Sequence, residues 1–368
     1  MKVFLNCVAE NNLGDDIFIK MICDRYDEEF FLINKNSFKL NYKIKNLKVI
    51  NVNNFVYKLF RKIGAFFSRR NIIESIILKN KDCLVTIGGS MFMEGKNFKK
   101  NYKTRQFLIY KKINKPYYII GANIGPIYTR EYVKLLMQEA LKNATDVCLR
   151  DRNSFELVSS LKNIRCASDI VFSYDISRYN NLKSDNKIII SVIDMNKKSE
   201  QIVNPNLEKY EKVICDLIDY FILKNFQVEL MSFCKEEGDE EAIERILKKT
   251  KHQEKISKYL YNGNIEEAIS ELASSKIIIG TRFHANILGL MLNKTIIPII
   301  YNDKTRNLLR DLTFEGRYID IDEIEKFNID SLENKDLNYK LDVTFQRKDA
   351  ERHFEKLDFI LNRKDKEK

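Results

Sequence analysis

Short runs of apolar residues alternate along the chain with longer segments in which apolar residues recur every three or four positions. The short runs are typical of strands buried on both faces, and the longer periodic segments are typical of amphipathic helices. Repeated alternation of the two predicts an α/β protein with parallel sheets covered by helices. The expected strands lie near residues 2–8, 29–35, 47–52, 82–87, 115–120, 146–149, 187–195, 227–231, 276–279, 295–301 and 317–322.

A polar stretch, DISRYNNLKSDN at 175–186, interrupts this rhythm and is the best candidate for a linker. A chain of 368 residues also exceeds what one hydrophobic core usually serves. We therefore expect two Rossmann-like domains that face a cleft. The N-terminal domain would cover 1–180, the C-terminal domain 187–342, and a charged helix 343–368.

The stretch at 275–301 carries the most informative polar residues, because a strand there runs through a tight turn into an apolar helix. The start of a helix attracts anions, and Thr281 is a plausible N-cap. Arg282 adds a fork suited to carboxylate or phosphate, and His284 adds a proton carrier near neutral pH. The alternative interpretation is that Arg282 and His284 are ordinary surface residues at the start of a helix. The apolar helix behind them and a total of only three histidines favour an active site.

Loops after other expected strands also carry polar or glycine residues. Ligands bind at the carboxyl ends of open parallel sheets, so these loops are expected to serve one site. The acidic residues have a second explanation as helix caps, and the glycines as tight turns. No GxGxxG dinucleotide fingerprint is present. The candidates are Asp15, Asp16, Gly89, Ser90, Glu94, Asn123 and Arg150.

The net charge of +11 is spread over scattered lysines, which is compatible with a solvated surface or with anionic small molecules, glycans or membranes. We expect no nucleic-acid partner. The seven cysteines show no CxxC and no Cys/His pair at metal spacing, so no metal site and reduced core thiols are expected. The N-terminus lacks the apolar core of a signal peptide, and no apolar run has the length of a membrane span. A cytoplasmic protein is expected.

Residues 55–79 predict a long helix with an apolar face bordered by basic residues. Such a helix either packs on a sheet or lies on a membrane surface. Peripheral contact with the inner membrane face is therefore a second interpretation. The apolar residues are Phe60, Ile63 and Phe67, and the basic residues are Arg61, Lys62, Arg69 and Arg70.

Read in order, the motifs resemble those of the polysaccharide pyruvyl transferase family over most of residues 1–312. Each motif is weak alone, and their shared order is what makes the resemblance specific. Phe283 is a departure, since leucine is commoner there. The motifs are NLGDD at 12–16, IGGSMF at 87–92, GANIGP at 121–126, RDRNS at 150–154, SD at 168–169 and GTRFHANILGLMLNKTIIPIIYNDKT at 280–305.

The resemblance implies a GT-B-like fold with acceptor and donor sides in the N- and C-terminal domains. It implies transfer of a pyruvyl group from phosphoenolpyruvate, as co-substrate and with no other cofactor, to a sugar hydroxyl. The acceptor would be a cell-surface polysaccharide or its lipid-linked oligosaccharide precursor. Arg282 and His284 would contact the donor and assist proton transfer, with Arg150 and Thr281 as further donor contacts. The acidic and glycine-loop candidates would bind the acceptor.

The chemistry of this reaction fits the residues. Phosphoenolpyruvate needs cationic groups, and a histidine can supply the acid and base steps. Two alternatives stay open. A GT-B-type nucleotide-sugar glycosyltransferase would share the fold, but no acidic ribose clamp is evident. A non-catalytic glycan-binding relative would have an eroded site, and the presence of both Arg282 and His284 argues against erosion.

Overall fold

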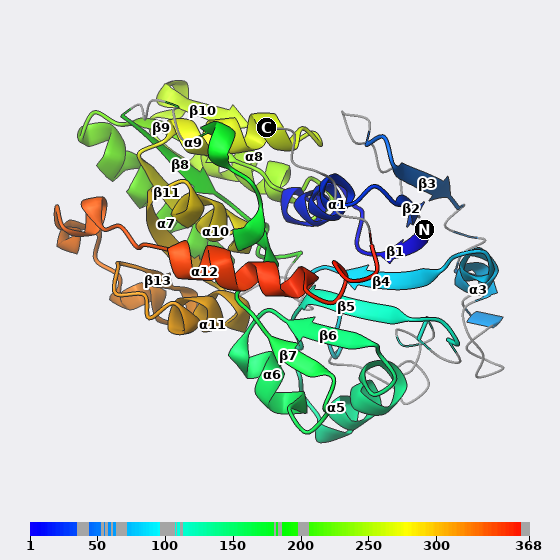
Figure 1. Ribbon diagram of the computed structural model, residues 1–368. Helices are drawn as coiled ribbons and strands as arrows, with labels where there is room; N and C mark the ends of the chain where they lie inside the picture. Colours follow the sequence, from blue (N-terminus) through cyan, green and yellow to red (C-terminus); the bar gives the residue numbers. More distant parts are fainter. Residues whose placement is uncertain are drawn as a thin grey trace. The chain divides into compact units, whose positions relative to one another are not determined.

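In a computed structural model, the chain folds into two compact units (Figure 1). The first unit comprises Met1–Glu10, Ile17–Ser173 and Gln346–Lys368, and the second comprises Asn11–Asp16 and Tyr174–Phe345. The structure describes residues 1–361 except 35–43, 53–54, 56–57, 60–61, 64–71, 96–106, 108, 111–112, 180–181, 183–185 and 198–205.

The first unit is built on a parallel sheet of seven strands in the order β3-β2-β1-β4-β5-β6-β7. The central strands β4 and β5 are buried at every position, as their uninterrupted apolar runs predict. The edge strand β3 is largely exposed. The strands are β1 (Lys2–Asn6), β2 (Glu29–Asn34), β3 (Leu47–Asn51), β4 (Cys83–Ile87), β5 (Tyr117–Ala122), β6 (Asp146–Leu149) and β7 (Ile164–Cys166).

Helices connect these strands. The helix α1 is apolar on several sides and its residues are buried along most of its length, as expected of a helix enclosed by the fold. The turn after α5 is a short π-helix. The helices are α1 (Leu13–Arg25), α3 (Ile72–Lys79), α5 (Arg130–Leu136), the π-helix η2 (Met137–Leu141) and α6 (Arg152–Val158), with 3-10 turns η3 (Ile170–Ser173) and η9 (Glu351–Phe354).

The second unit has a parallel sheet of six strands in the order β10-β9-β8-β11-β12-β13. Its β8, β11 and β12 are fully buried. The strands are β8 (Lys187–Ser191), β9 (Gln227–Met231), β10 (Ile256–Tyr259), β11 (Ile277–Gly280), β12 (Thr295–Ile300) and β13 (Ile319–Asp320).

The helices of the second unit show the predicted spacing of apolar residues, with their buried positions three and four apart, as in α9. They pack on the core of buried aliphatic residues that the sheet provides. The helices are α7 (Leu207–Leu223), α8 (Asp239–Lys249), α9 (Ile265–Ser274), α10 (Phe283–Met291) and α11 (Asp303–Asp311), with 3-10 turns η4 (Ser177–Tyr179), η5 (Gln253–Lys255), η6 (Ile321–Lys326), η7 (Ile329–Ser331) and η8 (Asp336–Asn338).

The α/β class and the two parallel sheets are confirmed, and every strand expected from the sequence is present. The short strands β7 and β10 were not expected, because each lies beside polar residues that hide the pattern. The division into units differs from the expected boundaries at two places. Residues 11–16 pack with the second unit, and the C-terminal segment packs with the first.

The C-terminal segment forms the helix α12 (Thr344–Ala350) and then the 3-10 turn η9, so its α-helix is shorter than the expected 343–368. It is held in the first unit by Arg25, which binds Glu351 and Asp358 through its guanidinium at 2.9 and 2.7 Å. The ring of Phe354 lies under the same guanidinium, 4.3 Å from its carbon.

The expected membrane-surface helix at 55–79 is described in part. Its last residues form α3, and Ile63 is exposed. Phe60, Phe67, Arg61, Arg69 and Arg70 lie outside the described residues. Within the part of the chain that the structure describes, no helix is long and apolar enough to cross a membrane.

Candidate active site

The turn between β11 and α10 lies where the order of strands reverses in the second unit. β8 and β11 pair side by side, with Ser191 opposite Gly280 at their carboxyl ends. Ligands of open parallel sheets bind at such switch points. The backbone N–H of Arg282 donates to Ser191 Oγ at 3.1 Å, and that of Thr281 donates to the Ser191 carbonyl at 3.2 Å.

A buried asparagine that the sequence analysis overlooked fixes the shape of this turn. Asn286 Nδ2 donates to the Gly280 carbonyl at 3.0 Å and to the Arg282 carbonyl at 3.3 Å. A Cβ at Gly280 would lie 2.1 Å from Asn286 Oδ1, so only glycine fits there. The sequence signal was a single amide within the apolar run of α10.

The prediction that Thr281 caps α10 is wrong. The N-cap position belongs to Arg282, which makes no capping hydrogen bond through its side chain. Thr281 is fully buried, and its hydroxyl lies 3.1 Å from the hydroxyl of Tyr210. The helix begins one residue later than expected, because Thr281 still belongs to the strand end that is tied to Ser191.

The guanidinium of Arg282 is buried and binds two carboxylates. Nε donates to Asp239 Oδ2 at 2.9 Å, NH2 donates to Asp239 Oδ1, and NH1 donates to Glu237. Burial by itself would lower the pKa of Arg282, but Asp239 and Glu237 raise it well above its ordinary value. Arg282 therefore remains a cation throughout the physiological range.

Asp239 connects this arginine to the loop that follows β9. The carboxylate is fully buried and accepts from the backbone N–H groups of Phe233 and Cys234 at 2.8 and 3.0 Å. Asp239 and Glu237 were not predicted from the sequence, although both follow an expected strand. Their signal was the acidic run EEGDE at 236–240.

Residues 11–16 pack on the same loop. The N–H of Leu13 donates to the Phe233 carbonyl at 3.0 Å, and Asn12 forms an isolated antiparallel bridge with Cys234. Gly14 lies directly against the imidazole of His284, since a Cβ at this glycine would be 1.8 Å from His284 Nδ1. His284, which is half-buried, is thus in contact with the NLGDD motif inside one unit.

Asp16 is fully buried beside this contact, whereas Asp15 is half-exposed. Tyr261 donates its hydroxyl hydrogen to Asp16 Oδ2 at 2.6 Å. Burial raises the pKa of Asp16 to about 7, against the lowering effect of the Tyr261 hydrogen bond and with a further rise from Asp15. The carboxyl group therefore gains and loses its proton close to neutral pH, as an acid–base group must.

A second polar cluster lies at the carboxyl ends of the strands in the first unit. Arg150, which follows β6, donates through NH1 to Asp169 at 3.0 Å and through NH2 to Asn123 at 2.7 Å. The guanidinium also lies against Gly89, where a Cβ would be 2.4 Å from NH1. Burial raises the pKa of Asp169, while Arg150 acts to lower it. Ser90 follows Gly89 and is half-buried.

Two acidic residues of the first unit, Glu94 and Asp151, form hydrogen bonds where helices begin. Glu94 accepts from the N–H groups of Tyr128 and Thr129 at 2.7 and 2.8 Å and from the Thr129 hydroxyl at 2.6 Å, so it fixes the loop whose last residue, Thr129, caps α5. Asp151 caps α6 by accepting from the N–H of Ser154 at 2.8 Å. These contacts give both carboxylates a structural role.

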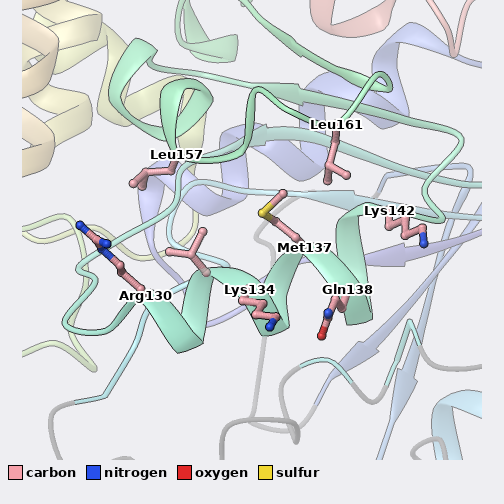
Figure 2. A pocket seen from close by; sticks show the side chains of 8 residues that line it. Arg130, Lys134, Met137, Gln138, Lys142, Leu157 and Leu161 are labelled. Atoms are coloured by element: carbon pink, nitrogen blue, oxygen red, sulfur yellow. The ribbon is translucent and has the colours of Figure 1, made fainter.

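The sequence-predicted residues fall in both units of the chain. Arg282, His284, Asp15 and Asp16 belong to the second unit, where Thr281 lies buried beside them, whereas Gly89, Asn123 and Arg150 are in contact within the first unit. A hollow of about 420 Å³ on the first unit contains none of these residues. Figure 2 shows it between α5 and α6, lined by Arg130, Lys134, Met137, Gln138, Lys142, Leu157 and Leu161.

Comparison with known families identifies a matching family model. The model described as polysaccharide pyruvyl transferase matches residues 11–303, which is most of the chain. The matched segment begins at the NLGDD loop and includes the turn that carries Arg282 and His284.

Solved structures with the same fold are distant in sequence. UDP-GlcNAc 2-epimerase from Methanocaldococcus jannaschii, in complex with UDP-GlcNAc and UDP, has a TM-score of 0.58 at 11% identity, covering 97% of this chain and 99% of that chain. The MnaA–UDP structure from S. aureus has a TM-score of 0.51 at 10% identity, covering 98% of this chain and 97% of that chain. Anabaena HepE in complex with UDP has a TM-score of 0.50 at 10% identity, covering 97% of this chain and 96% of that chain. These similarities establish a GT-B-like fold and nothing about ligands.

Proposed function

The chain belongs to the polysaccharide pyruvyl transferase family, and from this premise we propose that it transfers a pyruvyl group from phosphoenolpyruvate to a sugar hydroxyl. The acceptor belongs to a cell-surface polysaccharide or to its lipid-linked precursor. The product is a ketal, and inorganic phosphate is released. The acceptor class and the donor come to this chain from the family.

One observation supports the proposal above the others. A permanent cation and an imidazole lie two residues apart on the turn at the switch point of the second sheet, and the segment that packs against this imidazole carries an acid with a pKa of about 7. The contact between Gly14 and His284 brings the acid-bearing segment to the imidazole. Anion binding and proton transfer are the two tasks that phosphoenolpyruvate chemistry requires.

Ketal formation uses two hydroxyl groups of the acceptor. A proton adds to C3 of phosphoenolpyruvate and converts its methylene group to methyl, while one sugar hydroxyl oxygen bonds to C2. The C2–O bond to phosphate then breaks, and a second hydroxyl oxygen bonds to C2 to close the ketal. Of the two hydroxyl protons, one replaces the proton that was delivered to C3 and the other leaves with phosphate.

In this proposal His284 delivers the proton to C3, and Arg282 stabilises the anionic donor and the departing phosphate. Asp15 and Asp16 bind the acceptor, and at least one of them receives a proton from an acceptor hydroxyl. Asp15 is half-exposed, whereas Asp16 is buried and accepts from Tyr261. Arg150 remains a donor contact by resemblance alone, since its fork is bonded to Asp169 and Asn123.

Binding and turnover of phosphoenolpyruvate test the proposal. We expect the donor to raise the melting temperature of the protein, because it binds only the folded state. His284→Asn should retain much of this shift and lose turnover by roughly 100-fold or more, because it removes the proton carrier. Turnover is measured as phosphate release together with the mass gain of the acceptor.

The arginine needs a conservative variant. Arg282→Ala would leave Asp239 buried without its cation and destabilise the fold by about 3–5 kcal/mol. A loss of phosphoenolpyruvate binding in this variant could therefore result from unfolding as well as from the loss of a donor contact. Arg282→Lys keeps the charge and loses the planar fork, and we expect weaker donor binding in a folded protein. Stabilisation by UDP-sugars but not by phosphoenolpyruvate would instead identify a nucleotide-sugar glycosyltransferase.

A further inference from the structure

Arg282 is bonded to two carboxylates whose surroundings differ. Asp239 occupies the Nε and NH2 side of the guanidinium, and Glu237 occupies NH1. Together the three groups carry a net charge of minus one, since one cation faces two anions. An anionic donor would meet repulsion at such a site unless one carboxylate left it.

Asp239 is fixed in place. Its side chain is fully buried, and the same carboxylate accepts from the backbone N–H groups of Phe233 and Cys234. Moving it would leave two backbone donors and the arginine unsatisfied in the interior, which is costly. Asp239 is therefore a permanent part of the fold.

Glu237 is held differently. Its side chain is 33% exposed and lies in the tight turn before α8, where the N–H of Gly238 donates to the Lys235 carbonyl at 2.9 Å. Gly238 has a φ of +86°, and a Cβ there would lie 2.8 Å from Asp194 Cβ. The turn is thus fixed at Gly238, while the Glu237 side chain reaches Arg282 from the solvent side.

We propose that, in the absence of substrate, the Glu237 carboxylate occupies the position on Arg282 NH1 that phosphoenolpyruvate binds, and that phosphoenolpyruvate displaces it. This inference rests on the proposed function. An anionic group of the donor takes over NH1, and Glu237 moves into solvent, so the number of anions on the guanidinium stays the same. The exchange requires the Glu237 side chain, which is 33% exposed, to rotate away from NH1, while Asp239 keeps the fork oriented throughout.

Substitution of Glu237 by glutamine tests the exchange. Glu237→Gln keeps a hydrogen-bond acceptor for NH1 and removes the competing charge. We expect it to bind phosphoenolpyruvate roughly fivefold to tenfold more tightly than the wild type, because a charged hydrogen bond no longer has to be broken. Calorimetric titration with phosphoenolpyruvate measures this affinity. The KM for the donor should fall by a similar factor, with kcat changed little.

The neighbouring Glu236→Gln is the matched control. It removes the same charge from the same turn, and its side chain is exposed. We expect its donor affinity to equal that of the wild type. If Glu237→Gln binds the donor no more tightly than Glu236→Gln, or binds it more weakly, the exchange is wrong while the proposed function stands. If phosphoenolpyruvate binds none of the three proteins, both proposals fail.

Discussion

At the scale of single residues, Arg282 has two tasks that one side chain must reconcile. It is a buried structural cation that holds Asp239, and it is the residue that the family resemblance assigns to the donor. A planar fork makes this combination feasible, because its Nε side can serve the fold while NH1 serves a ligand. Lysine, a point charge, offers no such division.

Asp16 is a residue whose environment opposes its charge. Its folded pKa of about 7 lies above the ordinary value of 3.8, so the native state is destabilised as pH rises from about 4 to 7. Asp16→Asn keeps an acceptor for Tyr261 and cannot ionise. We expect it to raise the free energy of unfolding at pH 8 by at least about 1 kcal/mol and to change it much less at pH 5.

Urea unfolding at the two pH values measures this difference. If Asp16 also takes part in proton transfer, the stabilised variant will turn over more slowly. A gain in stability with unchanged turnover would assign Asp16 to packing alone. An equal effect at pH 5 and pH 8 would show that its folded pKa is not raised.

At the scale of elements, the NLGDD segment and α10 depend on the absence of a side chain at Gly14. Gly14→Ala places a methyl carbon where the imidazole of His284 lies. The helix itself tolerates alanine better than glycine by up to about 1 kcal/mol, so stability should change little. Displacement of the imidazole should reduce turnover by roughly 100-fold.

The double variant Gly14→Ala/His284→Asn separates displacement from other effects. If the methyl group acts only through His284, the double variant will be no slower than His284→Asn alone. A further loss in the double variant would mean that Gly14 serves the reaction independently of the imidazole. Melting curves of both proteins check that the segment remains folded.

The RDRNS motif shows how much of a functional signature can be structural. Arg150 joins Asp169 to Asn123, Asp151 caps α6, and Ser154 Oγ accepts from the N–H of Ile124 at 2.8 Å. These bonds tie together the loops that follow three successive strands of the first unit. The motif therefore builds the carboxyl edge of the sheet, whatever it also binds.

At the scale of the whole molecule, the C-terminal segment stabilises the first unit through a buried histidine. The N–H of Gly121 donates to His353 Nδ1 at 3.2 Å, and His353 Nε2 lies 2.9 Å from the Ser168 carbonyl. Burial lowers the pKa of His353 to about 3. In the native state His353 therefore stays neutral down to about pH 3. In the unfolded chain the same imidazole has its ordinary pKa of 6.5 and takes up a proton below that pH.

The stability that the neutral His353 contributes is complete above pH 6.5 and is lost as the pH falls toward 3. At pH 5 the loss is about 2 kcal/mol relative to pH 7. His353→Gln cannot take up this proton, so its unfolding free energy should fall by about 2 kcal/mol less than that of the wild type over the same interval. Identical losses in the two proteins would contradict a depressed pKa at His353.

The sequence by itself determined the class of the fold and the edge at which function is expected. Each buried strand is a local apolar run, and each connecting helix shows its own periodicity, so neither depends on distant residues. The rule that loops at the carboxyl ends gather polar residues then selected Arg282, His284 and the NLGDD segment. The fixed order of the motifs led to the family that the comparison supports.

Only the tertiary structure decided the partners of these residues. The carboxylates on Arg282 lie 43 and 45 residues away in the chain, and Tyr261 lies 245 residues from Asp16. No periodicity relates such positions, because their contact depends on how β9, β11 and residues 11–16 pack together. Burial raises the pKa of Asp16, and it encloses the ion pair between Arg282 and Asp239. Burial is a property of the packed unit and cannot be read from any segment within it.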